Sequence, residues 1–232
     1  MKQVYLGISF ASNVICMADN SLCCIGVFYD GSYFTYAQRY FFKRNLGWLR
    51  FPSFHFLLEN LVGEKEQGFS TFKVVHATWH QGLFTSSQAT ENQLKSQRNL
   101  DHDLMHAGIE AKYEPMSQNQ GEKGVDVAMA VDALAVGLQG KIDVAVLVTG
   151  DGDFVPLVRA LMNQGIRVVT VYFEYEDEGH RSFINERLRS TCNYALSVTA
   201  LEKDPHQQSM FSQLFRQSNK QNGLNVRQDV VR

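Results

Sequence analysis

The sequence predicts an α/β protein of the Rossmann-like type, a single domain whose three layers are built on a mainly parallel central sheet. Short apolar runs such as 144–148 end abruptly in turn residues, as buried parallel strands do. Segments with helical patterns alternate with these runs, which favours βαβ units. The chain has 232 residues, enough for one domain with a sizeable core and tails.

The first half of the predicted domain starts with an apolar run over 24–30 that ends in an aspartate. Ser32 is a favourable N-cap for a helix over 33–43, and Gly63 would end a second helix that begins at Ser53. The elements expected next are a strand over 72–79, a polar helix over 87–107 that stops at Gly108, and a short strand over 109–114.

The second half follows a polar, glycine-containing loop. We expect a helix over 125–138, a strand over 144–148, a helix from Asp153 to Gly165, a strand over 166–173, an acidic loop over 174–179, a helix over 181–190 and a last strand over 194–198. Right-handed crossovers would place every strand-to-helix turn on the same edge of the sheet.

The expected domain spans 23–201, with an N-terminal extension over 1–22 and a polar, disordered C-terminal tail over 202–232. The tail is rich in Gln, Asn and Ser, a composition that does not support a packed core. Its apolar residues Phe211, Leu214 and Phe215 leave two alternatives, a flexible tail or one amphipathic turn that binds a protein partner.

The composition bears on the binding partners and on the cellular compartment of the protein. The net charge of −2 does not indicate nucleic-acid binding by itself, although a local basic patch would still serve it. The four cysteines form no CxxC motif, which favours free thiols in a reducing compartment. We find neither a convincing signal peptide nor an apolar run of about 18–20 residues, so we expect a cytoplasmic protein without membrane contact.

Four aspartates follow the pattern expected of one site. Asp30 ends one strand, Asp151 and Asp153 follow another, and Asp126 lies in the first turn of a helix, so all four can meet at the carboxyl edge of the sheet. Thr149 adds a hydroxyl there. Each aspartate alone is explained by a turn or a helix start, but clustered carboxylates are unfavourable without protonation or a cation. Ligands made only of oxygen suit Mg²⁺ or Mn²⁺.

Three blocks of sequence resemble a known family. IGVFYDGSYF, KGVDVAMAVDAL and VLVTGDGDFVPLVRALMNQGIRVVTVYF are similar, in order and spacing, to the NYN domain in its LabA-like branch, which belongs to the PIN-like nucleases. The resemblance covers about 25–198. It implies a Rossmann-like fold and a Mg²⁺-dependent ribonuclease whose metal-binding aspartates fall on Asp30, Asp126, Asp151 and Asp153. Asp132 also matches the family pattern and either supports these residues or is a structural helix acid.

The function expected from the residues and the resemblance is metal-dependent hydrolysis of RNA phosphodiester bonds, with Mg²⁺ or Mn²⁺ as cofactor. The candidate substrate contacts are Ser32, Arg39, His80, Lys123 and Thr149. Tyr33, Tyr36 and Tyr40 either stack on unpaired bases or pack against the sheet. The alternative function is an RNA-binding or regulatory module with weak or no catalysis. Homo-oligomer formation stays open.

One competing motif lies elsewhere. His102 and His106 flank DLM in a pattern similar to the HExxH zinc motif, with Asp in place of Glu. No third ligand is evident in the sequence, and histidines are also favoured at a helix C-terminus. We therefore favour an ordinary helix end.

Overall fold

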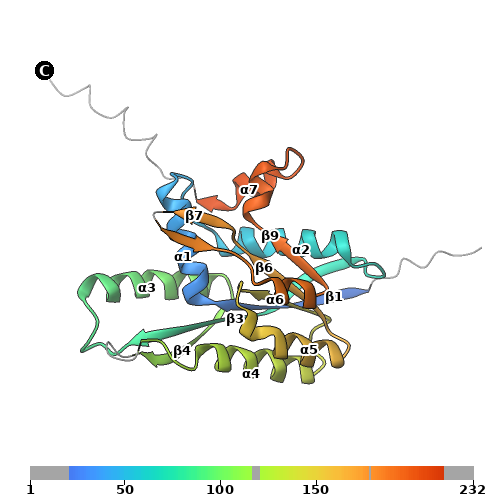
Figure 1. Cartoon of the computed structure of the whole chain (residues 1–232), viewed down its shortest axis with the longest axis horizontal. Coiled ribbons are helices and arrows are strands. Elements are labelled where there is room, and N and C mark those ends of the chain that lie inside the picture. The colour runs from blue at the N-terminus through green and yellow to red at the C-terminus, as the bar shows by residue number, and fades with distance from the viewer. Residues whose placement is uncertain (1–20, 117–120, 178, 217–232) are drawn as a thin grey trace, which may run out of the picture.

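The core of the computed structural model, which describes residues 21–116, 121–177 and 179–216, is a six-stranded sheet in which every pairing is parallel. Its order is β4-β3-β1-β5-β6-β9 (Figure 1). The strands are β1 (Leu22–Asp30), β3 (Thr71–Phe84), β4 (Glu110–Met116), β5 (Val144–Val148), β6 (Arg167–Tyr172) and β9 (Tyr194–Ser197). The predicted α/β fold with a parallel central sheet is confirmed.

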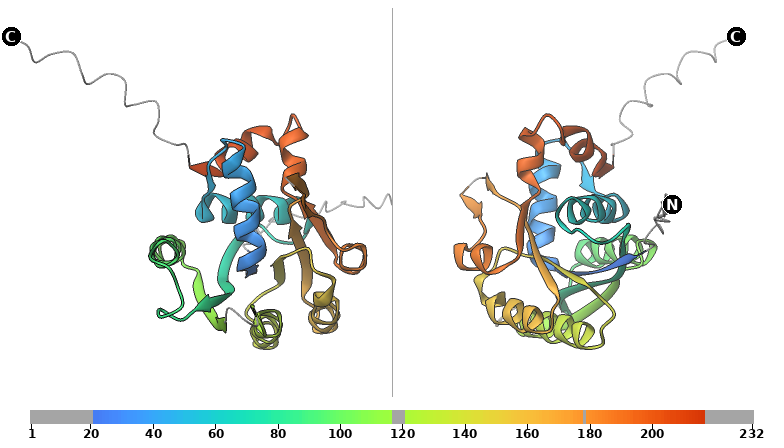
Figure 2. Two further views of the ribbon diagram at one scale, coloured as in Figure 1. Left: turned by 60° about the vertical axis from the view of Figure 1, so that its left-hand side comes forward. Right: turned by 90° about the vertical axis from the view of Figure 1, so that its right-hand side faces the viewer.

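Helices cover both faces of this sheet (Figure 2). One face carries α1 (Gly31–Lys43), α2 (Phe51–Lys65) and α3 (Glu91–His106), and the other carries α4 (Val125–Leu138), α5 (Val155–Asn163) and α6 (Glu186–Thr191). The strand period of two sends neighbouring residues of β1 into different cores. Tyr29 belongs to the core with Phe34 and Trp79, whereas Phe28 belongs to the core with Met129 and Leu147.

Several local expectations were wrong. The second helix, α2, begins at Phe51 rather than at Ser53 and continues past Gly63 to Lys65. The N-cap of α1 is Asp30 and not Ser32, because the Asp30 side chain accepts a hydrogen bond from the Tyr33 amide. In place of an acidic loop over 174–179 and a helix over 181–190, the chain forms a hairpin of β7 (Tyr175–Asp177) and β8 (His180–Ser182), followed by the shorter α6. Asn185 sets the later start of α6, since its side chain accepts from the amides of Arg187 and Leu188.

Part of the expected tail is folded. Residues 199–216 form η2 (Thr199–Lys203), α7 (Gln208–Gln213) and β10 (Phe215–Arg216), and β10 pairs with β2 (Trp48–Leu49). Phe211, Leu214 and Phe215 are buried, because their spacing lets them reach the core beside Phe41. The polar composition of the surrounding sequence gave no indication that these three apolar residues would be buried. The rest of the predicted tail, 217–232, and residues 1–20 of the predicted extension lie outside the described residues.

Candidate active site

Asp30 lies where β1 passes into α1. One carboxylate oxygen accepts from the Tyr33 amide at 3.0 Å, and the other accepts from the Thr149 hydroxyl at 3.4 Å. Burial raises the pKa of Asp30 to about 6, with the negative charges of Asp126 and Glu122 adding to the effect and these hydrogen bonds opposing it. The carboxyl group is therefore held where its charge is unfavourable unless a cation lies nearby.

Asp151 and Asp153 lie on the loop after β5, and both are exposed. The loop is tied to Asp30 by Thr149, whose hydroxyl also accepts from the Asp151 amide at 3.2 Å. Asp151 in turn accepts from the Asp153 amide at 2.9 Å, which begins η1 (Gly152–Phe154). Thr149 was a candidate substrate contact, but it is fully buried. It instead holds two acidic segments of the site together.

Asp126 lies in the first turn of α4, directly after Gly124, which takes a left-handed φ of 78°. Burial raises the pKa of Asp126, and the charges of Asp151, Glu122 and Asp153 raise it further. Asp126 therefore lies close enough to Asp151 and Asp153, and Asp30 close enough to Asp126, for their charges to repel at the carboxyl edge of the sheet.

Glu122 is a site residue that the sequence analysis missed. Its carboxylate accepts from the Ser32 hydroxyl at 2.8 Å and from the Gly82 amide of β3. A Cβ atom at Gly82 would lie 2.9 Å from Glu122 Cγ, so glycine is needed for this close approach. The available signal was an acid four positions before Asp126 in a loop at the same edge. Ser32, expected to contact substrate, is occupied by this carboxylate.

His80 does not reach the surface of the site. The residue is 1% exposed on β3, with Nε2 3.0 Å from Asp132 Oδ2 and 3.1 Å from the Thr78 hydroxyl. Asp132 also pairs with Lys112. Burial would raise the pKa of Asp132, but the hydrogen bonds from His80 and Lys112 hold it well below its usual range. His80 is thus not an exposed RNA contact, and Asp132 is a structural partner.

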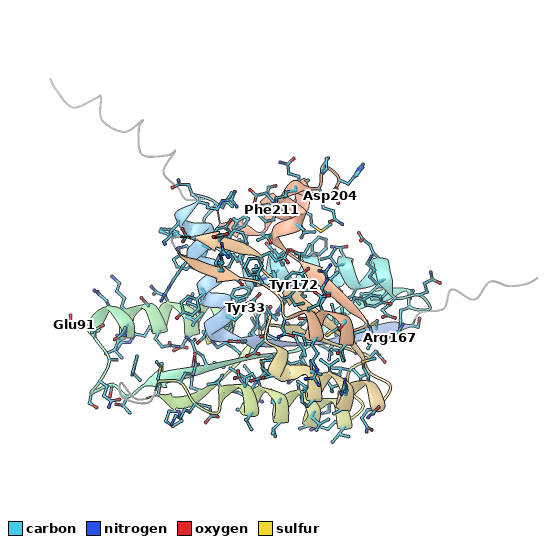
Figure 3. All side chains as sticks on the ribbon, viewed as in Figure 1. Tyr33, Glu91, Arg167, Tyr172, Asp204 and Phe211 are labelled. Atoms are coloured by element: carbon cyan, nitrogen blue, oxygen red, sulfur yellow. The ribbon has the colours of Figure 1, made fainter. Side chains whose placement is uncertain are left out.

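The other candidate contacts differ in exposure. Tyr33 is partly buried and packs against the core (Figure 3). Its hydroxyl accepts from the Phe173 amide at 2.8 Å, and Tyr40 stacks on Tyr175 with 4.3 Å between ring centroids. Tyr36 is 58% exposed, with Arg39 5.7 Å above its ring centroid. Lys123 is exposed beside the acidic edge. Arg39, Tyr36 and Lys123 are therefore accessible to a ligand.

His102 and His106 face each other on α3, with their Nε2 atoms 3.1 Å apart. Within the described ranges, no group of three or more His, Cys, Asp or Glu side chains is arranged to hold a metal ion, here or at the acidic edge. The donor chemistry of the acidic edge nevertheless fits Mg²⁺. All candidate ligand atoms at this edge are oxygens. Mg²⁺ usually binds one or two carboxylates, and waters and substrate phosphate complete its coordination shell.

Comparisons with known proteins agree with this architecture. The family model for the NYN domain matches residues 24–201. A crystal structure of a Vibrio parahaemolyticus protein of unknown function is similar to this chain, with a TM-score of 0.55 and 20% identity over 78% of this chain and 94% of the other. This likeness supports the fold alone. The comparison with curated proteins gives no match. Among the described helices, none combines the length and apolar character needed to cross a membrane.

Proposed function

The chain belongs to the NYN domain family, and on this basis we propose that it is a metal-dependent ribonuclease of the LabA-like branch that acts in the cytoplasm. The observation that carries the proposal is the edge where Asp30, Asp126, Asp151 and Asp153 gather, with the pKa of Asp30 raised to about 6. Such a concentration of negative charge is costly to a fold, and active sites are where such costs are retained.

Asp30 and Asp126 are the carboxylates that would hold Mg²⁺ or Mn²⁺, with Asp151 and Asp153 acting directly or through water. When bound, the ion supplies an activated water and stabilises the charge that develops on the phosphate and the leaving oxygen. Thr149 keeps Asp30 and the Asp151 loop in register through its two hydrogen bonds. No nucleophile from the protein is required.

Phosphate groups are repelled by this edge in the absence of a cation, so binding also needs positive charge around it. Lys123 adjoins the Asp126 helix, and Arg39 is exposed on α1. Both are suited to contact the RNA backbone. Lys123 precedes Asp126 by three residues and is therefore nearer to this aspartate along the chain than Arg39 is.

The test is cleavage of single-stranded RNAs by purified protein with Mg²⁺ or Mn²⁺ and with EDTA. We expect metal-dependent hydrolysis that Asp126→Asn and Asp151→Asn reduce by at least about 100-fold, since removing one charged group of a catalytic site costs several kcal/mol. Asp204→Asn is the matched control, because Asp204 lies beside α7 (Figure 3) and contacts the His206 amide.

Circular dichroism would establish that each variant is folded. Equal cleavage by wild type and a folded Asp151→Asn would contradict the site assignment. A wild-type protein that binds RNA but leaves it intact with either metal would support the alternative, a binding module without catalysis.

A further inference from the structure

Residues 183–185 pack directly against the acidic loop after β5. The Asn185 amide donates to the Gly150 carbonyl at 2.9 Å. A Cβ atom at Gly150 would lie 2.8 Å from the Phe183 carbonyl oxygen, and one at Gly152 would lie 2.6 Å from the Asn185 side chain. The two glycines of the Asp151 loop are therefore required by this neighbouring segment. The Phe183 backbone thus lies beside the loop that carries Asp151 and Asp153.

The Phe183 side chain is exposed, whereas its two neighbours in the chain, Ser182 and Ile184, are partly buried. The Ser182 hydroxyl donates to the Phe173 carbonyl at 2.7 Å, and Ile184 packs against the core formed with α4 and α5. Phe183 itself is 58% exposed. Full burial of a phenylalanine side chain stabilises a protein, and much of that gain is forgone here. A scattered exposed phenylalanine is ordinary, but the backbone of this one packs against the acidic loop.

We propose that Phe183 is the surface on which an unpaired nucleobase of the substrate stacks while the adjoining phosphodiester lies at the acidic edge. The proposal rests on the proposed function, because it takes RNA as the ligand. The net charge of −2 and the clustered carboxylates repel the RNA backbone. Stacking does not depend on charge and is tolerant of base identity, so a neutral aromatic ring can hold the strand where electrostatic attraction is weakest.

The same contact selects for strands with accessible bases. Bases inside a duplex are stacked on one another and cannot offer a face to Phe183 unless they are splayed out. Phe183 would therefore contribute to binding of single strands, loops and bulges and add nothing to binding of a continuous duplex.

The experiment is a thermodynamic cycle between the ring and the base. Binding of a labelled single-stranded RNA is measured by fluorescence anisotropy for wild type and Phe183→Ala, with Ca²⁺ in place of Mg²⁺ so that the acidic edge is neutralised. Gel electrophoresis checks that the RNA stays intact. Each protein is measured with intact RNA and with RNAs that lack one base in turn. We expect Phe183→Ala to weaken binding of intact RNA by about 5- to 150-fold, which corresponds to about 1–3 kcal/mol for one stacked base.

At one RNA position, the missing base should cost wild type a similar factor and cost Phe183→Ala nothing more, because the interaction is already lost. Phe183→Trp should restore binding. Phe56→Ala is the matched control, since Phe56 is 56% exposed but belongs to α2. An equal loss with Phe56→Ala, additive losses at every RNA position, or unchanged binding by Phe183→Ala would each overturn the proposal.

The outcomes separate this inference from the proposed function. Metal-dependent cleavage combined with unchanged RNA binding by Phe183→Ala would leave the ribonuclease proposal standing and overturn the stacking surface. A positive cycle in a protein that does not cleave RNA with Mg²⁺ or Mn²⁺ would support Phe183 as a base-stacking residue and contradict hydrolysis alone.

Discussion

Replacement of Asp30 by asparagine should stabilise the folded protein at neutral pH while removing a proposed metal ligand. Asparagine is as good an N-cap as aspartate, so the hydrogen bond from the Tyr33 amide at 3.0 Å can be kept. The Thr149 hydroxyl can rotate to accept from the new amide. What is lost is the negative charge that burial, Asp126 and Glu122 disfavour.

The size of the gain follows from the pKa of Asp30, which rises from 3.8 to about 6 on folding. A shift of about two units corresponds to about 3 kcal/mol, which is an upper value for Asp30→Asn at pH 7.5. The folded state binds this proton more tightly than the unfolded state. The penalty is therefore complete above about pH 6, shrinks as the pH falls, and is absent below about pH 4, where the group is protonated in both states.

Urea unfolding followed by circular dichroism in EDTA at pH 7.5 and pH 4 measures this gain. Asp143→Asn is the control, because Asp143 also accepts from a backbone amide, that of Cys24 at 2.8 Å, at the other end of β1. Mg²⁺ should stabilise wild type more than Asp30→Asn. The reasoning is refuted if Asp30→Asn is no more stable than wild type at pH 7.5, or if its advantage is the same at both pH values.

Three further predictions concern other parts of the structure. Gly82→Ala should displace Glu122, because the new methyl would lie 2.9 Å from the Glu122 Cγ. The displacement should lower cleavage at least tenfold in a folded protein. Glu122→Gln should keep more activity than Gly82→Ala if Glu122 acts by its position rather than by its charge. Asp132→Asn should destabilise the protein by about 1–3 kcal/mol at pH 7, as measured by urea unfolding. The loss should shrink as the pH falls, because the pKa of Asp132 is held below its usual range in the folded protein. A loss of stability that does not change with pH would contradict this. Phe211→Ala should cost about 3–5 kcal/mol and lower the melting temperature, whereas a tail without a structural role would leave it unchanged.

The sheet and the positions of the aspartates could be predicted from the sequence because each depends on a local signal. The helix over 125–138 has the predicted bounds, since Gly124 and Gly140 flank a long alanine-rich pattern. Asp30 and Asp151 follow apolar strands, and parallel pairing then places both at one edge.

The errors at the site have a different cause, which is dependence on contacts between residues far apart in the sequence. Glu122 acquires its place only through Ser32 and Gly82, which belong to other elements. His80 was predicted to contact RNA, yet Asp132 lies 52 positions along the chain and pairs with it in the interior. Neither relationship leaves a periodic pattern, so a single sequence cannot reveal it.

The pairing of β10 with β2 has a consequence for folding during synthesis on the ribosome. Phe215 pairs with Leu49 and contacts Phe41 of α1. During synthesis, the apolar surface around α1 and β2 must therefore wait for almost the whole described chain to leave the ribosome before it is covered. The sheet can assemble earlier, once β9 has emerged. A nascent chain whose sheet assembled at that point would expose an apolar side to which chaperones can bind.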